Sequence, residues 1–266
     1  MQETVGKMEL GEQGLARYAR HIVLRDVGGP GQMRLLASRV LVIGAGGIGS
    51  PAALYLAAAG VGHLTIVDDD TVSLSNLQRQ ILHRNADIGR AKTDSAVDAL
   101  KALNPDIAVV GRRLRLDADN ARPLIADHDI VLDGSDNFAT RLAVNAAAVA
   151  AERTLVSAAL GPFEGQLAVF RGHLPGAPCY RCFLGTEPPR EAGQSCAELG
   201  ILGAVAGVMG SWAALETLRE ILAIGDSLAG RMLLFDARSA STRIVRLRPD
   251  PACPVCAGEA SPEGKR

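Results

Sequence analysis

The chain has 266 residues, 48% of them apolar, so it is long enough to bury a full core as one domain of the larger kind. Its net charge of −1 excludes a general nucleic-acid-binding surface, which would be basic, and its aromatic content of 3% leaves the core to aliphatic residues and alanine. The most apolar stretch, 199–224, contains Glu216 and Glu220 as well as glycines, which predicts a buried helix rather than a membrane span.

The chain begins with a helical region that leads to a strand and a glycine loop. Residues up to about 37 are predicted to be helical, with Gly28-Gly29-Pro30-Gly31 as a break. The run 39–43 is short, apolar and β-branched, which is typical of a buried strand. The loop that follows fits the pattern G-x-G-x-x-G and contains Gly44, Gly46, Gly47 and Gly49.

A helix and a second strand complete this unit. The helix is predicted over 52–59, after Pro51 in its first turn, and the second strand over 64–67 ends in Asp68. Strand, glycine loop, helix, strand and an acid about 20 residues beyond the glycines make up a dinucleotide-binding fingerprint. Glycines let the backbone approach phosphate, and the acid accepts hydrogen bonds from ribose hydroxyls. We therefore predict a nucleotide site, although Asp68 could also be an exposed acid at a strand end.

The segment after Asp68 departs from what a dehydrogenase needs. Asn76, Arg79 and Gln80 follow at once, and their side chains suit the phosphates of a nucleotide better than a nicotinamide ring. Lys92 then starts an amphipathic helix that runs to about 103, in a chain with 4 lysines and 24 arginines. A compact ammonium at a helix start could bind a triphosphate, and the alternative is a solvated lysine.

The next strand, predicted over 129–132, also ends in acids. It is followed by Asp133, Asp136 and Asn137, and strand C-terminal ends are where open α/β sheets bind ligands. Asp136 could hold Mg²⁺ against phosphate oxygens, or it could be the N-cap of the helix expected over 137–152. Asp133 could be a strand-end acid that orients its neighbours.

The second half of the chain is predicted to extend the sheet. Residues 39 to about 160 alternate strand and helix, which is typical of a parallel sheet. Strands expected over 166–171, 232–236 and 242–247 are joined without short helical crossovers, which indicates an antiparallel addition. The predicted fold class is therefore α/β, a Rossmann-like and mostly parallel sheet with an antiparallel extension.

Two C-x-x-C pairs, separated by 70 residues, follow the first and the last strand of this extension. Four thiolates from two such pairs make a tetrahedral site for structural zinc, and the separation between the pairs would tie two distant segments together. Redox pairs or disulfides are the alternatives, but no signal peptide is seen, so we expect a cytoplasmic, reducing location and zinc. The predicted ligands are Cys179, Cys182, Cys253 and Cys256.

Cys196 is the fifth cysteine and lies outside these pairs. It follows a proline-rich loop, 186–191, and precedes the long apolar helix. A free cysteine is usually a small core residue, but one in a loop beside a nucleotide site could be a nucleophile.

Together these motifs resemble the adenylyltransferases that activate ubiquitin-like sulfur carriers, namely the molybdopterin-synthase and thiamine-pathway enzymes, which are relatives of the ubiquitin-activating enzymes. The resemblance covers nearly the whole chain. It rests on the N-terminal helix RYARHIVLR at 17–25, the segment SLSNLQRQ at 73–80, GVMG at 207–210 and the pairs CYRC and CPVC. It implies a single adenylyltransferase domain over 1–256. The nucleotide part would be 39–160, the carrier-binding and zinc part 161–256, and 257–266 a disordered tail.

The resemblance also implies roles for individual residues. The glycine loop and Asp68 would hold the adenosine part of ATP, while Asn76, Arg79 and Lys92 would bind the triphosphate and stabilise departing pyrophosphate. Asp136 would hold magnesium. Arg20 would reach into the site of a neighbouring subunit, which implies a homodimer. In some relatives the cysteine at the position of Cys196 joins covalently to the carrier.

The implied substrate is a ubiquitin-like sulfur carrier that ends in Gly-Gly, and the segment 72–80 favours the small subunit of molybdopterin synthase. A thiamine-pathway carrier is the alternative, and tRNA-thiolation or siderophore-type carriers stay open. Because no rhodanese-like extension follows Cys256, a separate sulfurtransferase is expected. An NAD-dependent dehydrogenase would explain the glycine loop but not Arg79, Lys92 or the cysteines, and a zinc-bearing scaffold would not need these cations.

Overall fold

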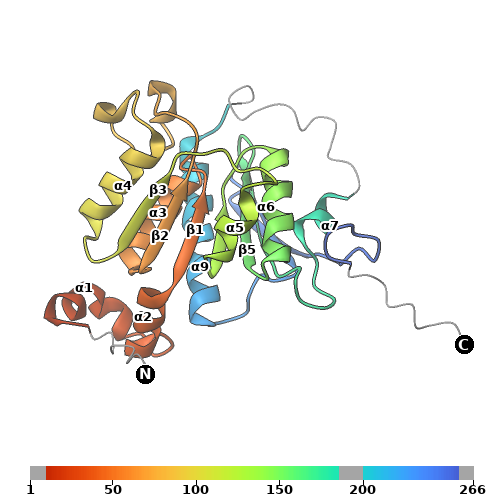
Figure 1. Ribbon diagram of the computed structural model, residues 1–266, viewed down its shortest axis with the longest axis horizontal. Coiled ribbons are helices and arrows are strands. Elements are labelled where there is room, and N and C mark those ends of the chain that lie inside the picture. Colours follow the sequence, from red (N-terminus) through yellow and green to blue (C-terminus); the bar gives the residue numbers. More distant parts are fainter. Residues whose placement is uncertain (1–9, 186–199, 258–266) are drawn as a thin grey trace, which may run out of the picture.

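One eight-stranded sheet runs through the molecule in the order β3-β2-β1-β4-β5-β6-β7-β8 (Figure 1). This is a computed structural model, and the structure describes residues 10–185 and 200–257. The strands are β1 (Arg39–Ile43), β2 (His63–Val67), β3 (Ala108–Arg112), β4 (Ile130–Asp133), β5 (Thr154–Leu160), β6 (Glu164–Phe170), β7 (Arg231–Asp236) and β8 (Ser241–Arg246).

The first five strands form the parallel half of the sheet. They pair in the order β3-β2-β1-β4-β5, all parallel, which is the order of a Rossmann fold. The connecting helices are α3 (Gly49–Ala59), α4 (Lys92–Leu103), α5 (Ala121–Ala126) and α6 (Phe138–Ala150). Between β2 and α4 the chain forms only the short turns η1 (Leu74–Asn76) and η2 (Asn85–Asp87). The prediction of a parallel sheet is confirmed.

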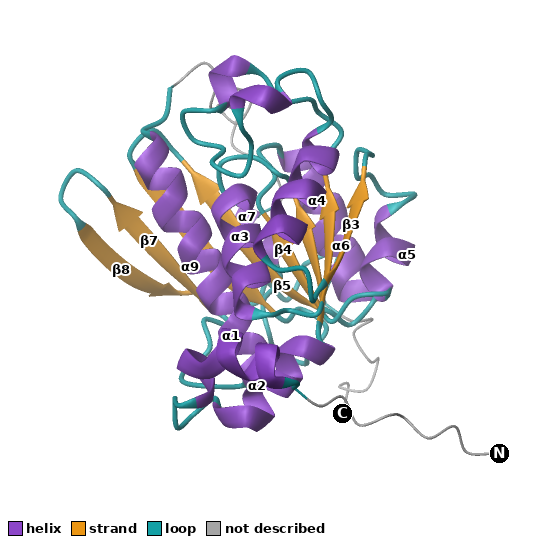
Figure 2. Ribbon diagram, turned by 90° about the vertical axis from the view of Figure 1, so that its left-hand side faces the viewer, coloured by secondary structure: helices purple, strands orange, loops and turns teal. Residues whose placement is uncertain are grey.

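Side chains of β1 alternate between two buried layers, as expected for a strand covered on both faces. Val40 and Val42 belong to the cluster that includes α3, α4 and the long helix α9 (Gly203–Leu222). Leu41 and Ile43 belong to the opposite cluster, with α5, α6 and the short helix α7 (Tyr180–Leu184). Figure 2 shows α3, α4 and α9 lying over one face of the sheet.

The antiparallel extension consists of β6, β7 and β8. The β5–β6, β6–β7 and β7–β8 pairs are all antiparallel, and the strand ends lie within two residues of those predicted. The long helix that the sequence predicts is α9. Within the described residues, no helix combines the length and the apolarity that crossing a membrane requires.

The prediction for the N-terminal region was wrong about its break. Helix α1 (Glu12–Ile22) ends before a turn at 23–27, and the glycine-rich run begins α2 (Gly28–Ala37). Gly28 adopts a positive φ of 59°, and Pro30 falls in the first turn, where a helix has no use for the missing N–H. The predicted tail lies, from residue 258 on, outside the described residues.

Candidate nucleotide site and cysteine cluster

The glycine loop between β1 and α3 contains two glycines that its own packing requires. A Cβ on Gly49 would lie 1.7 Å from the carbonyl oxygen of Gly44, which no adjustment of side chains could relieve. Gly44 has a φ of +87°, and a Cβ there would lie 3.2 Å from the carbonyl oxygen of Gly134. These two positions therefore need glycine for the fold itself.

Gly46 is different, because it leaves room for a ligand. A Cβ on Gly46 would contact only Gln80 Nε2, at an ordinary 3.7 Å, and a Cβ on Gly47 would lie 3.2 Å from the Ala206 methyl. Within the described part of the chain, the backbone N–H groups of Gly46 and Gly47 have no hydrogen-bond acceptor. They are free to donate to phosphate oxygens at the start of α3.

This difference predicts opposite results for two alanine variants. Gly46→Ala should fold with a free energy of unfolding within about 1 kcal/mol of the original, yet bind ATP at least about 10-fold more weakly, because its methyl group blocks the close approach of phosphate. Gly49→Ala should be destabilised by about 3 kcal/mol, because its Cβ overlaps the backbone. Thermal unfolding and calorimetric ATP titration measure both. Equal destabilisation of the two variants would contradict the distinction.

Asp68 connects the end of β2 to the glycine loop. Its Oδ2 accepts a hydrogen bond from the Ala45 N–H at 2.8 Å, and its Oδ1 accepts one from the Asp70 N–H at 2.9 Å. The side chain is half-buried, so its remaining lone pairs can face a ribose. Asp69 next to it is exposed.

The segment 71–91 brings two of the predicted polar residues against the glycine loop. The stem of Arg79 reaches within 3.7 Å of a Cβ position on Gly47, and its guanidinium donates to the Ser75 carbonyl at 3.0 Å. Gln80 is 4% exposed, and its buried Oε1 has no partner among the described residues. The side chain of Asn76 accepts from the Ser73 N–H and shapes the turn η1.

Lys92 is a buried cation rather than a solvated one. It is 6% exposed, and its Nζ lies 2.8 Å from Oδ2 of Asp70. Partial burial raises the pKa of Asp70, but the hydrogen bonds from Lys92 and the Thr71 N–H, together with the nearby positive charges, outweigh that effect, and the pKa is lowered. Asp70 was not among the predicted site residues, and the adjacent acids gave no signal as to which one pairs with Lys92.

Acidic and hydroxyl groups gather after β4, at the same edge of the sheet. Asp133 is 1% exposed, and its Oδ1 accepts from the Ser135 N–H at 2.9 Å. Its Oδ2 and the buried Ser135 hydroxyl have no partner among the described residues. Asn137, not Asp136, caps α6 by accepting from the Thr140 N–H at 2.9 Å. The N-cap alternative for Asp136 was therefore wrong, and its carboxylate is exposed.

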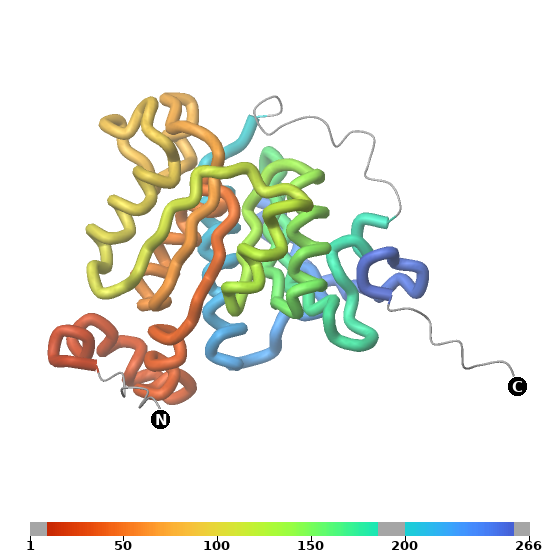
Figure 3. Tube along the Cα trace, viewed as in Figure 1, coloured from red at the N-terminus to blue at the C-terminus, as the bar shows by residue number. Residues whose placement is uncertain are grey.

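Arg20 does not join the site of its own chain. It is exposed on α1, which is fixed by the ends of other helices: Asn104, after α4, donates to the Tyr18 hydroxyl at 2.9 Å. In Figure 3 the red helix α1 lies at the opposite end of the sheet from the orange and yellow segment 71–91. Any contact of Arg20 with a nucleotide would have to be made in another copy of the chain.

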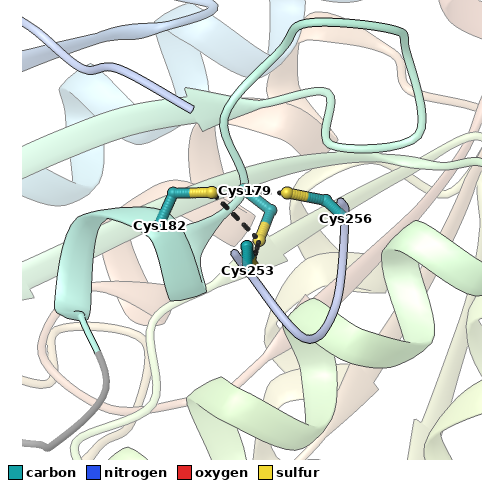
Figure 4. A group of neighbouring side chains, drawn as sticks. All are labelled: Cys179, Cys182, Cys253 and Cys256. Atoms are coloured by element: carbon teal, nitrogen blue, oxygen red, sulfur yellow. Dashed lines mark hydrogen bonds between the residues drawn. The ribbon is translucent and has the colours of Figure 1, made fainter. Parts of the chain in front are cut away.

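The four predicted cysteine ligands meet in one cluster (Figure 4). Their sulfur atoms all lie within 4.8 Å of one another, with Sγ separations of 4.0 Å for Cys179–Cys182, 3.7 Å for Cys179–Cys253 and 3.3 Å for Cys182–Cys256. The edge of a ZnS₄ tetrahedron is about 3.8 Å for Zn–S bonds of about 2.3 Å. The thiols are free rather than paired, so the cluster fits a tetrahedral metal better than disulfides.

Comparison with known proteins places the chain in a family. Residues 18–255 match the description "ThiF family". The chain belongs to the ThiF family. It is 48% identical over 246 residues to "Adenylyltransferase and sulfurtransferase MOCS3-1" of Zea mays, covering 92% of this chain and 52% of that protein. The chain thus spans about half the length of the first curated relatives that it matches.

Other relatives match this ThiF-family chain over most of their length. "Sulfur carrier protein adenylyltransferase" of Thermus thermophilus is 45% identical over 251 residues, which is 93% of each chain. The crystal structure of E. coli MccB with MccA-N7isoASN has a TM-score of 0.79 at 22% identity, covering 91% of this chain and 74% of that one. At this identity the likeness shows a common fold.

The cysteine cluster of this ThiF-family chain has a support in α6 that the sequence did not reveal. Asn145 donates to the Cys179 sulfur at 3.5 Å and accepts from the Tyr180 N–H at 2.8 Å. Burial raises the pKa of Cys253, but backbone N–H groups of Cys256 and Val255 and the neighbouring thiols together lower it to about 7. Burial raises the pKa of Cys179 and of Cys256, so without a metal the cluster favours one thiolate at Cys253 beside protonated neighbours. Cys196, the predicted possible nucleophile, lies outside the described residues.

Proposed function

We propose that this chain adenylylates the C-terminal glycine carboxylate of a ubiquitin-like sulfur carrier. A carboxylate oxygen attacks the α-phosphorus of ATP, the bond from that phosphorus to the bridging oxygen breaks, and pyrophosphate leaves with the electron pair. One observation carries the proposal. A glycine loop with free N–H groups and the buried cation Lys92 lie at one edge of the sheet, in a chain that is 45% identical over 93% of its length to a named sulfur carrier protein adenylyltransferase.

The reaction needs positioning and charge more than covalent help from the protein. The glycine loop and Asp68 would hold the nucleotide, and Asn76, Arg79, Gln80 and Lys92 would neutralise the triphosphate and the departing pyrophosphate. Lys92 would exchange its bond to Asp70 for one to phosphate. An NAD-dependent dehydrogenase has no use for a buried lysine at this place, so the observation favours nucleotidyl transfer.

The residues after β4 fit a magnesium ion. Asp136 offers an exposed carboxylate, and the oxygens of Asp133 and Ser135 that lack a partner among the described residues lie beside it in the chain. These are the oxygen ligands that Mg²⁺ prefers. Bound there, the ion would supply positive charge to the phosphate oxygens. Asn137 has committed one lone pair of its side-chain oxygen to the helix cap, and its NH₂ group can donate to a ligand.

The remaining parts of the proposal concern partners. Arg20 would complete the site of a second copy, which makes the active form a homodimer. The carrier would be the small subunit of molybdopterin synthase, with a thiamine-pathway carrier as the alternative, and a sulfurtransferase separate from these 266 residues would then supply sulfur. The cysteine cluster would hold zinc in a structural role, because all four tetrahedral positions are filled by protein.

ATP–pyrophosphate exchange tests the proposal directly. The purified protein, magnesium and each candidate carrier are combined in turn, and exchange is expected with one carrier only. It should vanish when the last glycine of that carrier is removed, because the attacking carboxylate is then displaced. Exchange that is independent of any carrier, or none with all of them, would contradict the proposal.

A further inference from the structure

His83 is a buried histidine of the segment 71–91 that none of the roles above uses. It is 5% exposed, and both ring nitrogens are engaged. Nε2 lies 3.0 Å from the carbonyl oxygen of Ala45 in the glycine loop, and Nδ1 lies 2.9 Å from the hydroxyl oxygen of Ser95 in α4. The imidazole thus connects the glycine loop to the helix that begins with Lys92.

The Ala45 partner fixes one hydrogen of the ring. A carbonyl oxygen can only accept, so Nε2 must carry the hydrogen that bonds Ala45. In the neutral ring Nδ1 then carries no hydrogen and lies against the Ser95 hydroxyl, which also hydrogen-bonds the Asp87 carboxylate. Burial lowers the pKa of His83, which favours this neutral form.

The bond from His83 acts on a peptide unit whose other side faces the ligand. Ala45 is held at three points: its carbonyl accepts from His83 and, at 3.2 Å, from the Ser50 hydroxyl, while its N–H donates to Asp68. A trans peptide is planar, so the Ala45 C=O and the Gly46 N–H point in opposite directions. Because the Ala45 carbonyl points toward buried His83 and Ser50, the Gly46 N–H points away from them. No described residue accepts a hydrogen bond from this N–H.

We propose that His83 is a positioning residue for the nucleotide, which aims the Gly46 N–H at phosphate and sets the glycine loop at a fixed place relative to Lys92. This inference rests on the proposed function only in that ATP occupies the glycine loop. The N–H groups of the loop and the ammonium of Lys92 belong to different elements, and the imidazole is a direct connection between those elements. Without it, the loop keeps the bonds of Ala45 to Ser50 and Asp68 but loses its direct connection to α4, which lets the two sets of donors shift relative to each other.

Three substitutions of His83 separate this role from simple core packing. In His83→Gln the amide nitrogen of the new side chain would reach the place of Nε2, so the bond to Ala45 is kept. In His83→Asn the shorter side chain would reach only the place of Nδ1, so that bond is lost. The Kd for ATP with magnesium, measured by calorimetry, should stay within about 3-fold in His83→Gln. It should rise about 10-fold or more in His83→Asn and His83→Ala, the size expected for one lost buried hydrogen bond.

His128→Ala is the matched control. His128 is 4% exposed and also engages both nitrogens, with the Leu124 carbonyl and the Thr65 hydroxyl, but it lies before β4, away from the glycine loop. This variant should lose stability without a change in the Kd for ATP. Equal Kd values in His83→Gln and His83→Asn, or a Kd raised as much by His128→Ala, would overturn the proposal.

The binding measurement needs no carrier, so it is separate from the test of the proposed function. If the original protein binds ATP but exchanges no pyrophosphate, the proposed reaction fails while the comparison of the His83 variants still decides the role of His83. If the original protein binds no ATP, the inference about His83 is overturned as well.

Discussion

Replacing Asp136 with alanine is expected to lower ATP–pyrophosphate exchange by about 100-fold or more while the protein stays folded. The carboxylate is exposed and makes no hydrogen bond to the described residues, and the cap of α6 comes from its neighbour Asn137. The free energy of unfolding should therefore change by no more than about 0.5 kcal/mol. The loss of exchange would arise because the site can no longer hold Mg²⁺ firmly against the phosphates.

The comparison needs a second exposed carboxylate at the same edge of the sheet. Asp69 is that carboxylate, because it is exposed beside Asp68 and has no place in the proposed site, and Asp69→Ala is therefore the control variant. We expect near-normal exchange from this variant. Exchange by Asp136→Ala should recover in part as the magnesium concentration is raised, which a folding defect would not produce. Full exchange by Asp136→Ala at ordinary magnesium concentrations would refute the metal role.

Replacing Cys253 with serine is expected to remove bound zinc and to lower the free energy of unfolding by about 3 kcal/mol or more. The Cys253 side chain is 2% exposed, and its partners across the cluster lie more than 70 positions earlier in the chain, so the metal would tie together two segments distant in sequence. The midpoint of thermal unfolding should fall by about 10 °C. Metal analysis and thermal unfolding measure the two effects.

Cys196→Ser makes the same chemical change outside the two C-x-x-C pairs and serves as the control for zinc content. The original protein and this variant should each retain one equivalent of zinc per chain. Treating the original protein with a strong chelator should reproduce the lower unfolding midpoint of Cys253→Ser. Protein that is purified without chelator and contains no zinc, or a variant as stable as the original, would contradict the structural role of the metal.

The sequence predicted those parts of the fold and site that depend on local signals. The glycine loop, Asp68 at the end of the second strand and the parallel half of the sheet follow from a strand, a turn and a helix in close succession, and the structure confirms the arrangement. The cysteine cluster was predictable because two C-x-x-C pairs are a typical set of ligands for structural zinc. In each case neighbouring residues carry enough information to define the contact.

Other contacts depend on the path of segments without a periodic pattern. The ion pair of Lys92 with Asp70 and the bonds of His83 arise because 71–91 folds back over the glycine loop with only two short turns of helix. No hydrophobic period in that segment indicates its course. The helix cap was ambiguous for a simpler reason: Asp136 and Asn137 are adjacent, and both residue types cap helices well.

The continuous sheet also limits how the protein can move. Strand β5 pairs with β4 on one side and with β6 on the other, and α9 packs in the same core cluster as strands from both halves. Rotating the two halves about a hinge would tear the β5–β6 ladder and expose that core, at the cost of several backbone hydrogen bonds. Closure around a substrate is therefore expected to come from loops at the carboxyl edge, over a scaffold that stays stiff throughout turnover.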